Sequence, residues 1–132
     1  MVPATEPVRI FLVDDSPEFI RSAENFLAGE TKVKVVGHAT SGQEALAKIS
    51  GCRPDLVLMD LAMPGMNGLV TIARLRAMTG STRMVILTLH DSLEYRTAAA
   101  QVGADGFISK TDFAVDLFSL IRTLFSKGDR AG

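Results

Sequence analysis

Short apolar runs rich in Val, Ile and Leu recur along the chain, and each is followed by a segment whose apolar residues have helical spacing. This alternation predicts βα units around a parallel sheet. About five units are expected, and the first, third and fourth runs are almost continuously apolar, as in strands that helices cover on both faces. The expected strands are Val8–Val13, Lys32–Ala39, Asp55–Met59, Met84–Leu87 and Gly106–Ser109.

Helix start signals stand between the expected strands. Ser16 precedes a proline and fits an N-cap, Ser41 with Glu44 forms a capping-box pattern, and Asp91 with Glu94 resembles another. Two of the helices carry apolar stripes that predict a face turned to the core. The stripes are Phe19, Ile20, Ala23, Phe26 and Leu27, and Phe113, Leu117, Leu120, Ile121 and Leu124.

The fourth expected helix differs from the others. From Glu94 to Gln101 it offers Tyr95 and small alanines but no large aliphatic side chain to bury. Low apolar contact predicts weak docking and a candidate moving element. A small-residue helix packed close against its neighbour is the alternative, and the sequence leaves both open.

Glycines are expected near the ends of elements, as helix C-caps and turns require. No linker or tandem repeat divides the chain, so we expect one domain over residues 8–126. Residues 1–7 form an N-terminal tail, and residues 127–132 form a C-terminal tail or the start of a linker. The glycines in question are Gly29, Gly37, Gly51, Gly80 and Gly103.

Composition narrows the class of protein. A chain of 132 residues, 47% hydrophobic and 22% charged, fits one globular domain and makes a multidomain enzyme improbable. With 14 basic and 15 acidic residues the net charge is -1, so direct binding of nucleic acid by this chain is not expected. Cys52 has no second cysteine to pair with, and no apolar run indicates a signal peptide or a membrane span. We therefore expect a cytoplasmic protein without a membrane partner.

Polar residues follow the apolar runs at the positions where open α/β sheets bind ligands. They are Asp14 and Asp15 after the first run, Asp60 after the third, Thr88 after the fourth and Lys110 after the fifth. Each alone has an ordinary explanation as a helix cap, a turn residue or a solvated charge. A 2-1-3-4-5 strand order would nevertheless bring the three carboxylates into one cleft.

Clustered carboxylates favour a cation, and Mg²⁺ suits a site of few carboxylates with room for phosphate oxygens. The two histidines, His38 and His90, and one cysteine lack the usual pattern of a zinc site. Thr88 and Lys110 supply a hydroxyl and an ammonium that can stabilise a phosphoryl group. Asp60 is the candidate nucleophile, because it follows the most buried strand and precedes a glycine-containing loop.

Four segments in this order resemble the receiver domain of two-component response regulators, in the CheY-like superfamily. The resemblance runs from about Val8 to Phe125 and implies a flavodoxin-like (βα)5 three-layer sandwich, with a parallel five-stranded sheet of order 2-1-3-4-5. The segments are Val13–Ser16, Leu58–Gly68, Leu87–Thr88 and Gly103–Lys110.

The resemblance implies that Asp60 accepts a phosphoryl group from a histidine kinase or a histidine phosphotransfer protein. It also implies that Asp15 and Asp60 ligate Mg²⁺ directly, that Asp14 acts through a water, and that the backbone carbonyl of Ala62 supplies a further oxygen. The chain would then be a regulatory domain that catalyses only its own phosphorylation and dephosphorylation, and not an enzyme.

By the same resemblance, Thr88 and Lys110 contact the phosphoryl oxygens and Phe107 occupies an aromatic switch position. Phosphorylation would draw Thr88 and Lys110 inward and change the face made by the fourth helix, the fifth strand and the fifth helix. The segment 91–101 is then the element whose conformational populations change on phosphorylation. Residues 87–91 are similar to receivers that precede a helix-turn-helix domain, which implies control of transcription.

Some positions depart from the usual pattern of the family. Leu89 stands where a small residue is common, which predicts narrower access to the cleft, and His90 follows it. Thr111 replaces a proline that is cis in many receivers, so we expect trans geometry or a tolerated strain there. Phe107 lacks a tyrosine hydroxyl, so a switch at this position must work through packing alone.

Other readings of the function stay open at this point. A stand-alone regulator or phosphorelay carrier would need no effector domain in the same protein, whereas the main reading needs a C-terminal DNA-binding domain or a separate effector. A phosphatase of the haloacid dehalogenase type needs a second Asp where Ala62 stands, and a pseudo-receiver usually lacks acidic or lysine positions that are present here. The helical face near Arg122 is either solvated or a homodimer contact.

Overall fold

The computed structural model describes residues 6–60, 68–89 and 93–125. Within these residues five strands form one parallel sheet of order β2-β1-β3-β4-β5, which confirms the predicted flavodoxin-like topology. None of the described helices is long and apolar enough to cross a bilayer. The elements are β1 Val8–Val13, α1 Pro17–Ala28, β2 Val33–Ala39, α2 Gly42–Cys52, β3 Leu56–Asp60, α3 Gly68–Met78, β4 Arg83–Thr88, α4 Leu93–Gln101, β5 Gly106–Ser109, a 3-10 turn η1 Lys110–Asp112 and α5 Phe113–Leu124.

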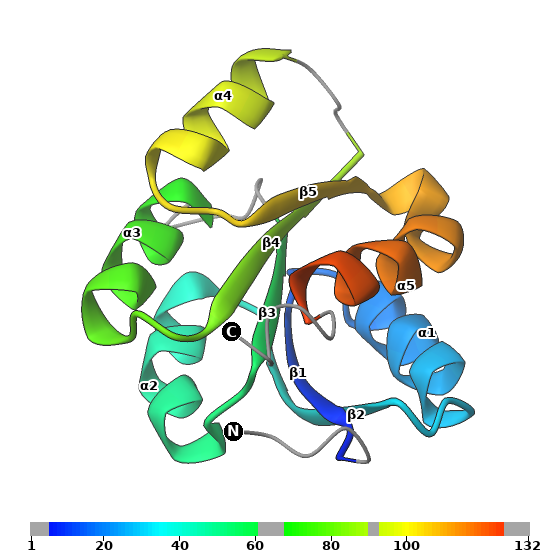
Figure 1. Cartoon of the computed structure of the whole chain (residues 1–132). Helices are drawn as coiled ribbons and strands as arrows, with labels where there is room; N and C mark the ends of the chain where they lie inside the picture. Colours follow the sequence, from blue (N-terminus) through cyan, green and yellow to red (C-terminus); the bar gives the residue numbers. More distant parts are fainter. Residues whose placement is uncertain (1–5, 61–67, 90–92, 126–132) are drawn as a thin grey trace.

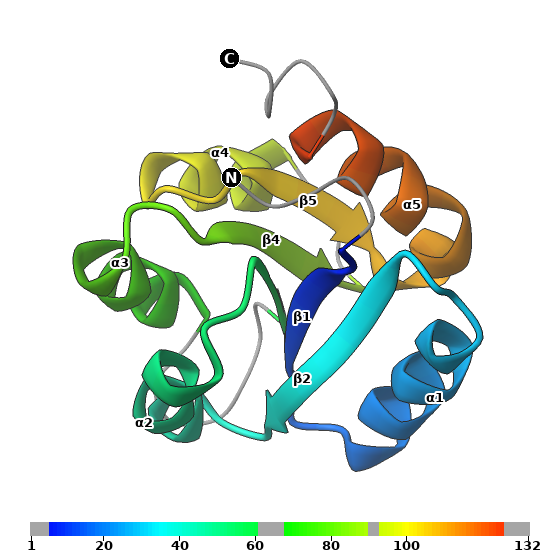
Figure 2. The same ribbon diagram turned by 60° about the horizontal axis from the view of Figure 1, so that its bottom comes forward.

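The sheet lies between two layers of helices (Figures 1 and 2). Helices α1 and α5 cover one face and share a buried cluster that includes Ile20, Leu27 and Leu117. Helices α2 and α3 cover the other face, where Ile49 and Leu75 are buried against the strands. Because apolar side chains meet the sheet from both sides, the central strands are buried on both faces, as their continuous apolar runs predicted.

Helix α4 contributes little apolar burial. Of its side chains that the structure describes, Ala99 is buried, whereas Leu93 at its start is 78% exposed. The helix packs beside β5 at the edge of the sheet (Figure 1). This sparse packing agrees with the weak docking expected from the sequence, and the role of α4 as a moving element stays a prediction.

The start of α2 is held by a capping arrangement close to the predicted one. Ser41 Oγ accepts a hydrogen bond from Glu44 N at 3.1 Å, and Glu44 Oε1 accepts one from Thr40 N at 2.8 Å. The reciprocal bond therefore goes to Thr40 rather than to the cap residue itself. The hydrogen bond from Lys48 and that from Thr40 lower the pKa of Glu44 to about 2.

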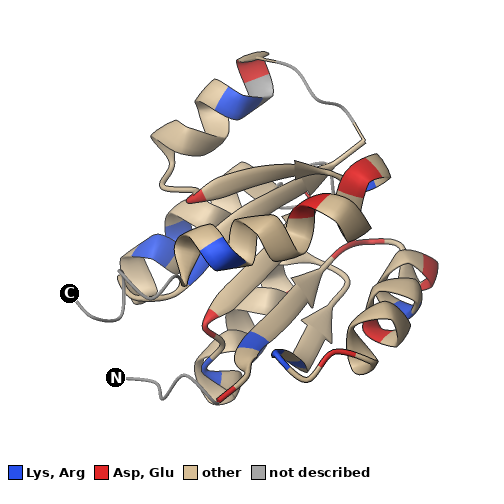
Figure 3. Cartoon of the chain, turned by 45° about the vertical axis from the view of Figure 1, so that its right-hand side comes forward, with Lys and Arg blue, Asp and Glu red and all other residues tan. Residues whose placement is uncertain are grey.

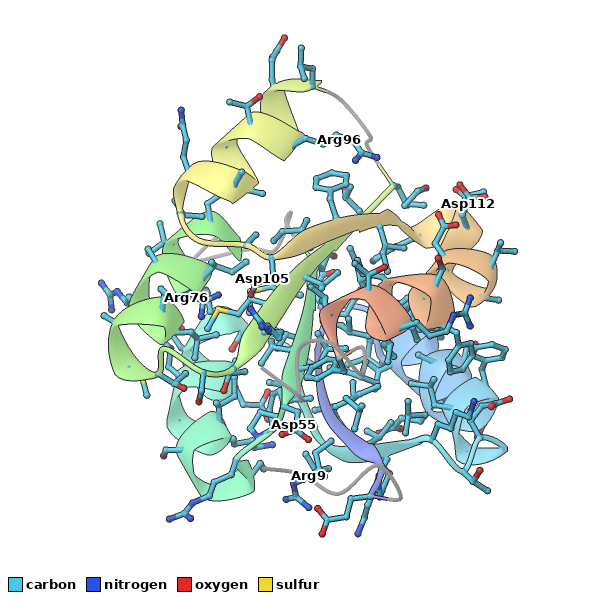
Figure 4. All side chains as sticks on the ribbon, viewed as in Figure 1. Arg9, Asp55, Arg76, Arg96, Asp105 and Asp112 are labelled. Atoms are coloured by element: carbon cyan, nitrogen blue, oxygen red, sulfur yellow. The ribbon has the colours of Figure 1, made fainter. Side chains whose placement is uncertain are left out.

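Two Arg–Asp pairs brace the end of the sheet where the strands begin (Figure 4). Arg9 N donates to Asp55 Oδ2 at 2.9 Å, which joins β1 to the residue before β3. Arg76 Nη2 donates to Asp105 Oδ2 and to Gly103 O, each at 2.7 Å, and so ties α3 to the connection that enters β5. Because these contacts join the segments where the strands begin, they also fix the positions of the carboxyl ends of the strands relative to one another.

One of the glycine predictions is wrong. Gly37 lies inside β2, where the pairing with β1 shifts register between Ile10 and Phe11, and not at an element end. Gly51 lies near the end of α2, as predicted, although the left-handed residue that ends the helix is Arg53, with φ of 48°. At Gly37 the reason is space, because the ring of a fully buried Phe11 packs directly against its backbone.

Replacing Gly37 with alanine is expected to lower the free energy of unfolding by about 1–3 kcal/mol, because an added methyl overpacks this contact. Its Cβ would lie 2.9 Å from Phe11 Cε2 and 3.1 Å from Cys52 Sγ, and the Phe11 ring is fully buried. Urea denaturation measures the change. The control is Gly51→Ala, where nothing lies within 4 Å and the helix gains up to about 1 kcal/mol. Equal stability of Gly37→Ala and wild type would contradict the prediction.

Candidate functional site: an acidic cluster with one lysine

The polar residues singled out in the sequence gather at the carboxyl end of the sheet. Asp14 directly follows β1, Asp60 is the last residue of β3, and Thr88 is the last residue of β4. Asp60 pairs with Leu87 and Thr88 with Ser109, so these positions are still held by the sheet instead of by a loop. Figure 3 shows acidic segments at the β1–α1 connection and at the start of α5, which border this end.

The structure brings Asp14, Asp15 and Asp60 together. One carboxylate oxygen of each lies within 4.8 Å of the other two. Asp14 is 1% exposed and Asp60 is 6% exposed, whereas Asp15 faces solvent. Two buried carboxylates and an exposed one thus form an acidic cluster that reaches the surface at Asp15.

Lys110 supplies the positive charge in this cluster. Its Nζ lies 2.5 Å from Asp14 Oδ2 and 3.3 Å from Asp60 Oδ2, and its side chain is 12% exposed. Burial by itself would lower the pKa of Lys110, but the hydrogen bond and charge of Asp14 and the charge of Asp60 outweigh it and raise the pKa. The amine is therefore a protonated, firmly held cation at neutral pH.

The β1–α1 connection orients Asp14 through the cap of α1. Ser16 N donates to Asp14 Oδ1 at 2.9 Å, and Ser16 Oγ accepts from Phe19 N at 3.2 Å. One serine therefore caps the helix, as predicted, and fixes the rotation of the Asp14 carboxylate. The other oxygen of Asp14, Oδ2, is buried and contacts the ammonium of Lys110.

The carboxylate oxygens of this cluster are suited to bind a small divalent cation. All three cluster side chains are carboxylates, the ligands that Mg²⁺ prefers, and Asp15 is exposed to the water that usually completes the coordination of this ion. Each carboxylate oxygen has two lone pairs, so Asp14 Oδ2 can accept from Lys110 and still contact a cation or its bound water. Lys110 offsets one charge only, so the cluster keeps an excess of negative charge that a cation would balance.

Thr88 lies on β4, next to β3, and Phe107 lies on β5. Thr88 is 1% exposed at the end of β4. Phe107 lies half-buried in β5, and the guanidinium of Arg96 from α4 stacks over its ring at 4.6 Å from the centroid (Figure 4). The structure therefore joins the predicted switch position to α4 through a cation–π contact that the sequence did not reveal.

Some of the sequence predictions fall outside the described residues. They include the Ala62 carbonyl, His90, and the cap expected at Asp91. Leu89 is described and is 68% exposed. The peptide bond before Thr111 is trans, which is one of the two geometries expected there.

Phe19 was assigned only to the core stripe of α1. The structure does pack it against the core, and it also places its ring 4.6 Å from Lys110 Nζ. An aromatic residue in an amphipathic stripe gives no signal of such a contact, because the same pattern is expected for core packing alone.

Proteins of known family and known structure are similar to this chain. The family model of the response regulator receiver domain matches residues 10–122 of the chain. Among solved structures, the signal receiver domain of the response regulator NarL from Mycobacterium tuberculosis matches with a TM-score of 0.79 and 33% identity, covering 89% of this chain and 98% of that chain.

Two curated relatives extend the comparison. The nitrate/nitrite response regulator protein NarL of Escherichia coli (strain K12) is 34% identical over 116 residues, which cover 88% of this chain and 54% of that protein. A protein-glutamate methylesterase/protein-glutamine glutaminase of Geobacillus kaustophilus (strain HTA426) is 35% identical over 123 residues, which cover 91% of this chain and 35% of that protein. The chain thus spans about half or less of the length of these relatives.

Proposed function

The chain belongs to the response regulator receiver domain family, and from this premise we propose that it accepts a phosphoryl group on Asp60 from a histidine kinase or a histidine phosphotransfer protein. The observation that carries the proposal is the Lys110 ammonium held between Asp14 and Asp60, with the exposed Asp15 carboxylate beside them. A nucleophilic carboxylate, further carboxylates for a cation and a fixed amine are the parts that phosphoryl transfer to an aspartate needs.

In the proposed transfer, a carboxylate oxygen of Asp60 attacks the phosphorus of the phosphohistidine donor. The new O–P bond forms as the N–P bond breaks, and the electron pair of that bond returns to the imidazole nitrogen. Lys110, which stays protonated because its pKa is raised by Asp14 and Asp60, donates to the phosphoryl oxygens. The Thr88 hydroxyl, at the end of the next strand, is the second donor.

Mg²⁺ is part of the proposal. Asp15 and Asp60 would ligate it directly and Asp14 through a water, with the carbonyl of Ala62 as a further oxygen. When bound, the ion neutralises charge on the phosphoryl oxygens during transfer. The residues of the chain contribute the prearranged carboxylates and the ammonium of Lys110 beside them.

The output of the switch is proposed to pass through α4, β5 and α5. Phosphoryl oxygens would draw Thr88 and Lys110 inward, and Phe107 would turn toward the space left behind, releasing its contact with Arg96. Helix α4 is suited to respond because little apolar contact holds it. The signal would be a shift in the populations of the conformations of α4, and not a new fold.

The effector is proposed to be a DNA-binding domain that follows the receiver, with residues 8–126 as the receiver and residues 127–132 as the start of the connection. Similarity to the probable transcriptional regulatory protein NarL of Mycobacterium tuberculosis supports this class of effector, while similarity to a protein-glutamate methylesterase supports an enzyme as the other class. The receiver itself catalyses only its own phosphorylation and dephosphorylation. A cytoplasmic location agrees with the free Cys52 thiol.

Incubation with Mg²⁺ and acetyl phosphate or phosphoramidate, followed by intact mass measurement, tests the proposal. We expect a mass increase of one phosphoryl group that is absent without Mg²⁺ and absent in Asp60→Asn. The control is Asp112→Asn, an exposed aspartate on the same end of the molecule, which is expected to react like wild type. An unmodified wild-type protein, or a modification that survives Asp60→Asn, would refute phosphorylation of Asp60.

A further inference from the structure

The ammonium of Lys110 is enclosed by an aromatic ring as well as by carboxylates. Asp14 and Asp60 contact it at 2.5 and 3.3 Å, and the ring of Phe19 lies with its centroid 4.6 Å from Nζ. An ammonium over the face of an aromatic ring is attracted by the ring quadrupole, and the attraction grows when water is excluded. With its side chain 12% exposed, Lys110 meets that condition.

Two independent contacts fix the position of the Phe19 ring. Through the backbone, Phe19 N donates a hydrogen bond to Ser16 Oγ, and Ser16 N donates one to the carboxylate of Asp14. Through the ring, Phe19 makes an edge-to-face contact with Phe113, with centroids 5.6 Å apart and ring planes at 74°. Phe113 is buried and begins α5 directly after the turn that Lys110 opens. The ring is thus tied to two of the three chain segments that build the cluster, those of Asp14 and Lys110.

We propose that Phe19 is a positioning residue for phosphoryl transfer, a role that rests on the proposed function and names a further part of the site. Its ring offers the ammonium an attractive face without a competing hydrogen-bond acceptor. The N–H groups of Lys110 are therefore left for the oxygens of Asp14, Asp60 and the incoming phosphoryl group. Because a cation–π contact has no fixed donor direction, it persists while Lys110 moves from the carboxylate to the phosphoryl oxygens.

Core packing alone would give Phe19 no such role, and Phe26 provides the matched comparison. Phe26 lies on the same helix and in the same apolar stripe, and its ring also contacts Phe113, with centroids 6.0 Å apart. Its other described ring contact is with Phe118 of α5. Shortening either phenylalanine to leucine removes a ring contact with Phe113, although Phe26 is the more exposed of the two, at 40%. Only Phe19 has a ring contact with Lys110 among the described aromatic interactions.

The test compares Phe19→Leu, Phe19→Tyr and Phe26→Leu in the full chain. The rate of phosphorylation by phosphoramidate at fixed Mg²⁺ is measured by intact mass and normalised to the folded fraction. We expect Phe19→Leu to lower the rate by about fivefold, and Phe19→Tyr, which keeps the ring face, and Phe26→Leu to stay within about twofold of wild type.

A spectroscopic readout separates positioning from folding. The CεH₂ resonance of Lys110 is expected to be shifted by the ring current in wild type, Phe19→Tyr and Phe26→Leu, and to move toward its random-coil position in Phe19→Leu. A wild-type rate in Phe19→Leu, an equal loss in Phe26→Leu, a Phe19→Tyr variant as slow as Phe19→Leu, or an unshifted Lys110 resonance in wild type would overturn the inference. A wild-type protein that takes no phosphoryl group would overturn the proposed function and the inference with it.

Discussion

Replacing Lys110 with methionine is expected to slow phosphorylation of Asp60 on the order of 100-fold, the usual cost of removing one prearranged donor from a site of developing charge. The free energy of unfolding is expected to fall by about 2 kcal/mol, less than for a fully buried ion pair, because the cluster is open to solvent at Asp15. Methionine keeps most of the side-chain volume, so the change tests the charge. Phosphoramidate kinetics and urea denaturation measure the two effects.

The raised pKa of Lys110 determines how the loss of stability in Lys110→Met depends on pH. The folded state raises the pKa of Lys110 above its ordinary value of 10.5, so its contribution to stability is complete below that value and declines only as the pH rises through the folded pKa. The stability gap between wild type and Lys110→Met should therefore be the same at every pH from neutral to mildly alkaline. A gap that closes within that range would contradict the assignment of a raised pKa.

Lys48→Met is the matched control for the Lys110 variant. Lys48 pairs with Glu44 one helical turn earlier, but both side chains are largely exposed, at 48% and 35%. Such a surface pair is worth up to about 0.5 kcal/mol, and Lys48 lies on α2, away from the cluster. Phosphorylation should proceed at the wild-type rate. A similar loss of rate in both variants would show that net charge, rather than the position of Lys110, matters.

The fold could be predicted from the sequence because each strand is a short apolar run, and burial on both faces makes the runs of β1, β3 and β4 almost continuously apolar. Its candidate site was visible for a related reason. Asp60 and Thr88 end apolar strands, so they stand out as polar residues at positions where the sheet presents them to one edge. The strand-order rule then places those edges together, and the carboxylate distances agree with it.

Features that depend on contacts between distant segments could not be predicted in this way. Gly37 resembles any turn glycine until the structure shows the Phe11 ring against it. Phe19 resembles any core residue of an amphipathic helix, and its second contact depends on where Lys110 arrives from the far end of the chain. Local patterns predict which face of an element is buried, but they do not predict which side chain of a distant element it meets.

Saturating Mg²⁺ is expected to stabilise the protein by about 2.7 kcal/mol at 100 times its dissociation constant, because a ligand that binds only the folded state adds its binding free energy to folding. The cluster holds three carboxylates within 4.8 Å of one another and one ammonium, so the cation relieves repulsion that is already present. Thermal unfolding with and without Mg²⁺ measures the gain, and calorimetric titration measures the binding constant independently.

Asp15→Asn should remove most of this gain without harming the fold, because Asp15 is the exposed member of the cluster and supports no described hydrogen bond. In the absence of Mg²⁺ the variant should be as stable as wild type or slightly more stable, since one of the repelling charges is gone. Glu18→Gln is the control: it removes an equally exposed acidic charge from the first turn of α1, outside the cluster, and should keep the full response to Mg²⁺. Equal Mg²⁺ responses in Asp15→Asn and Glu18→Gln would mean that the ion does not bind at these carboxylates.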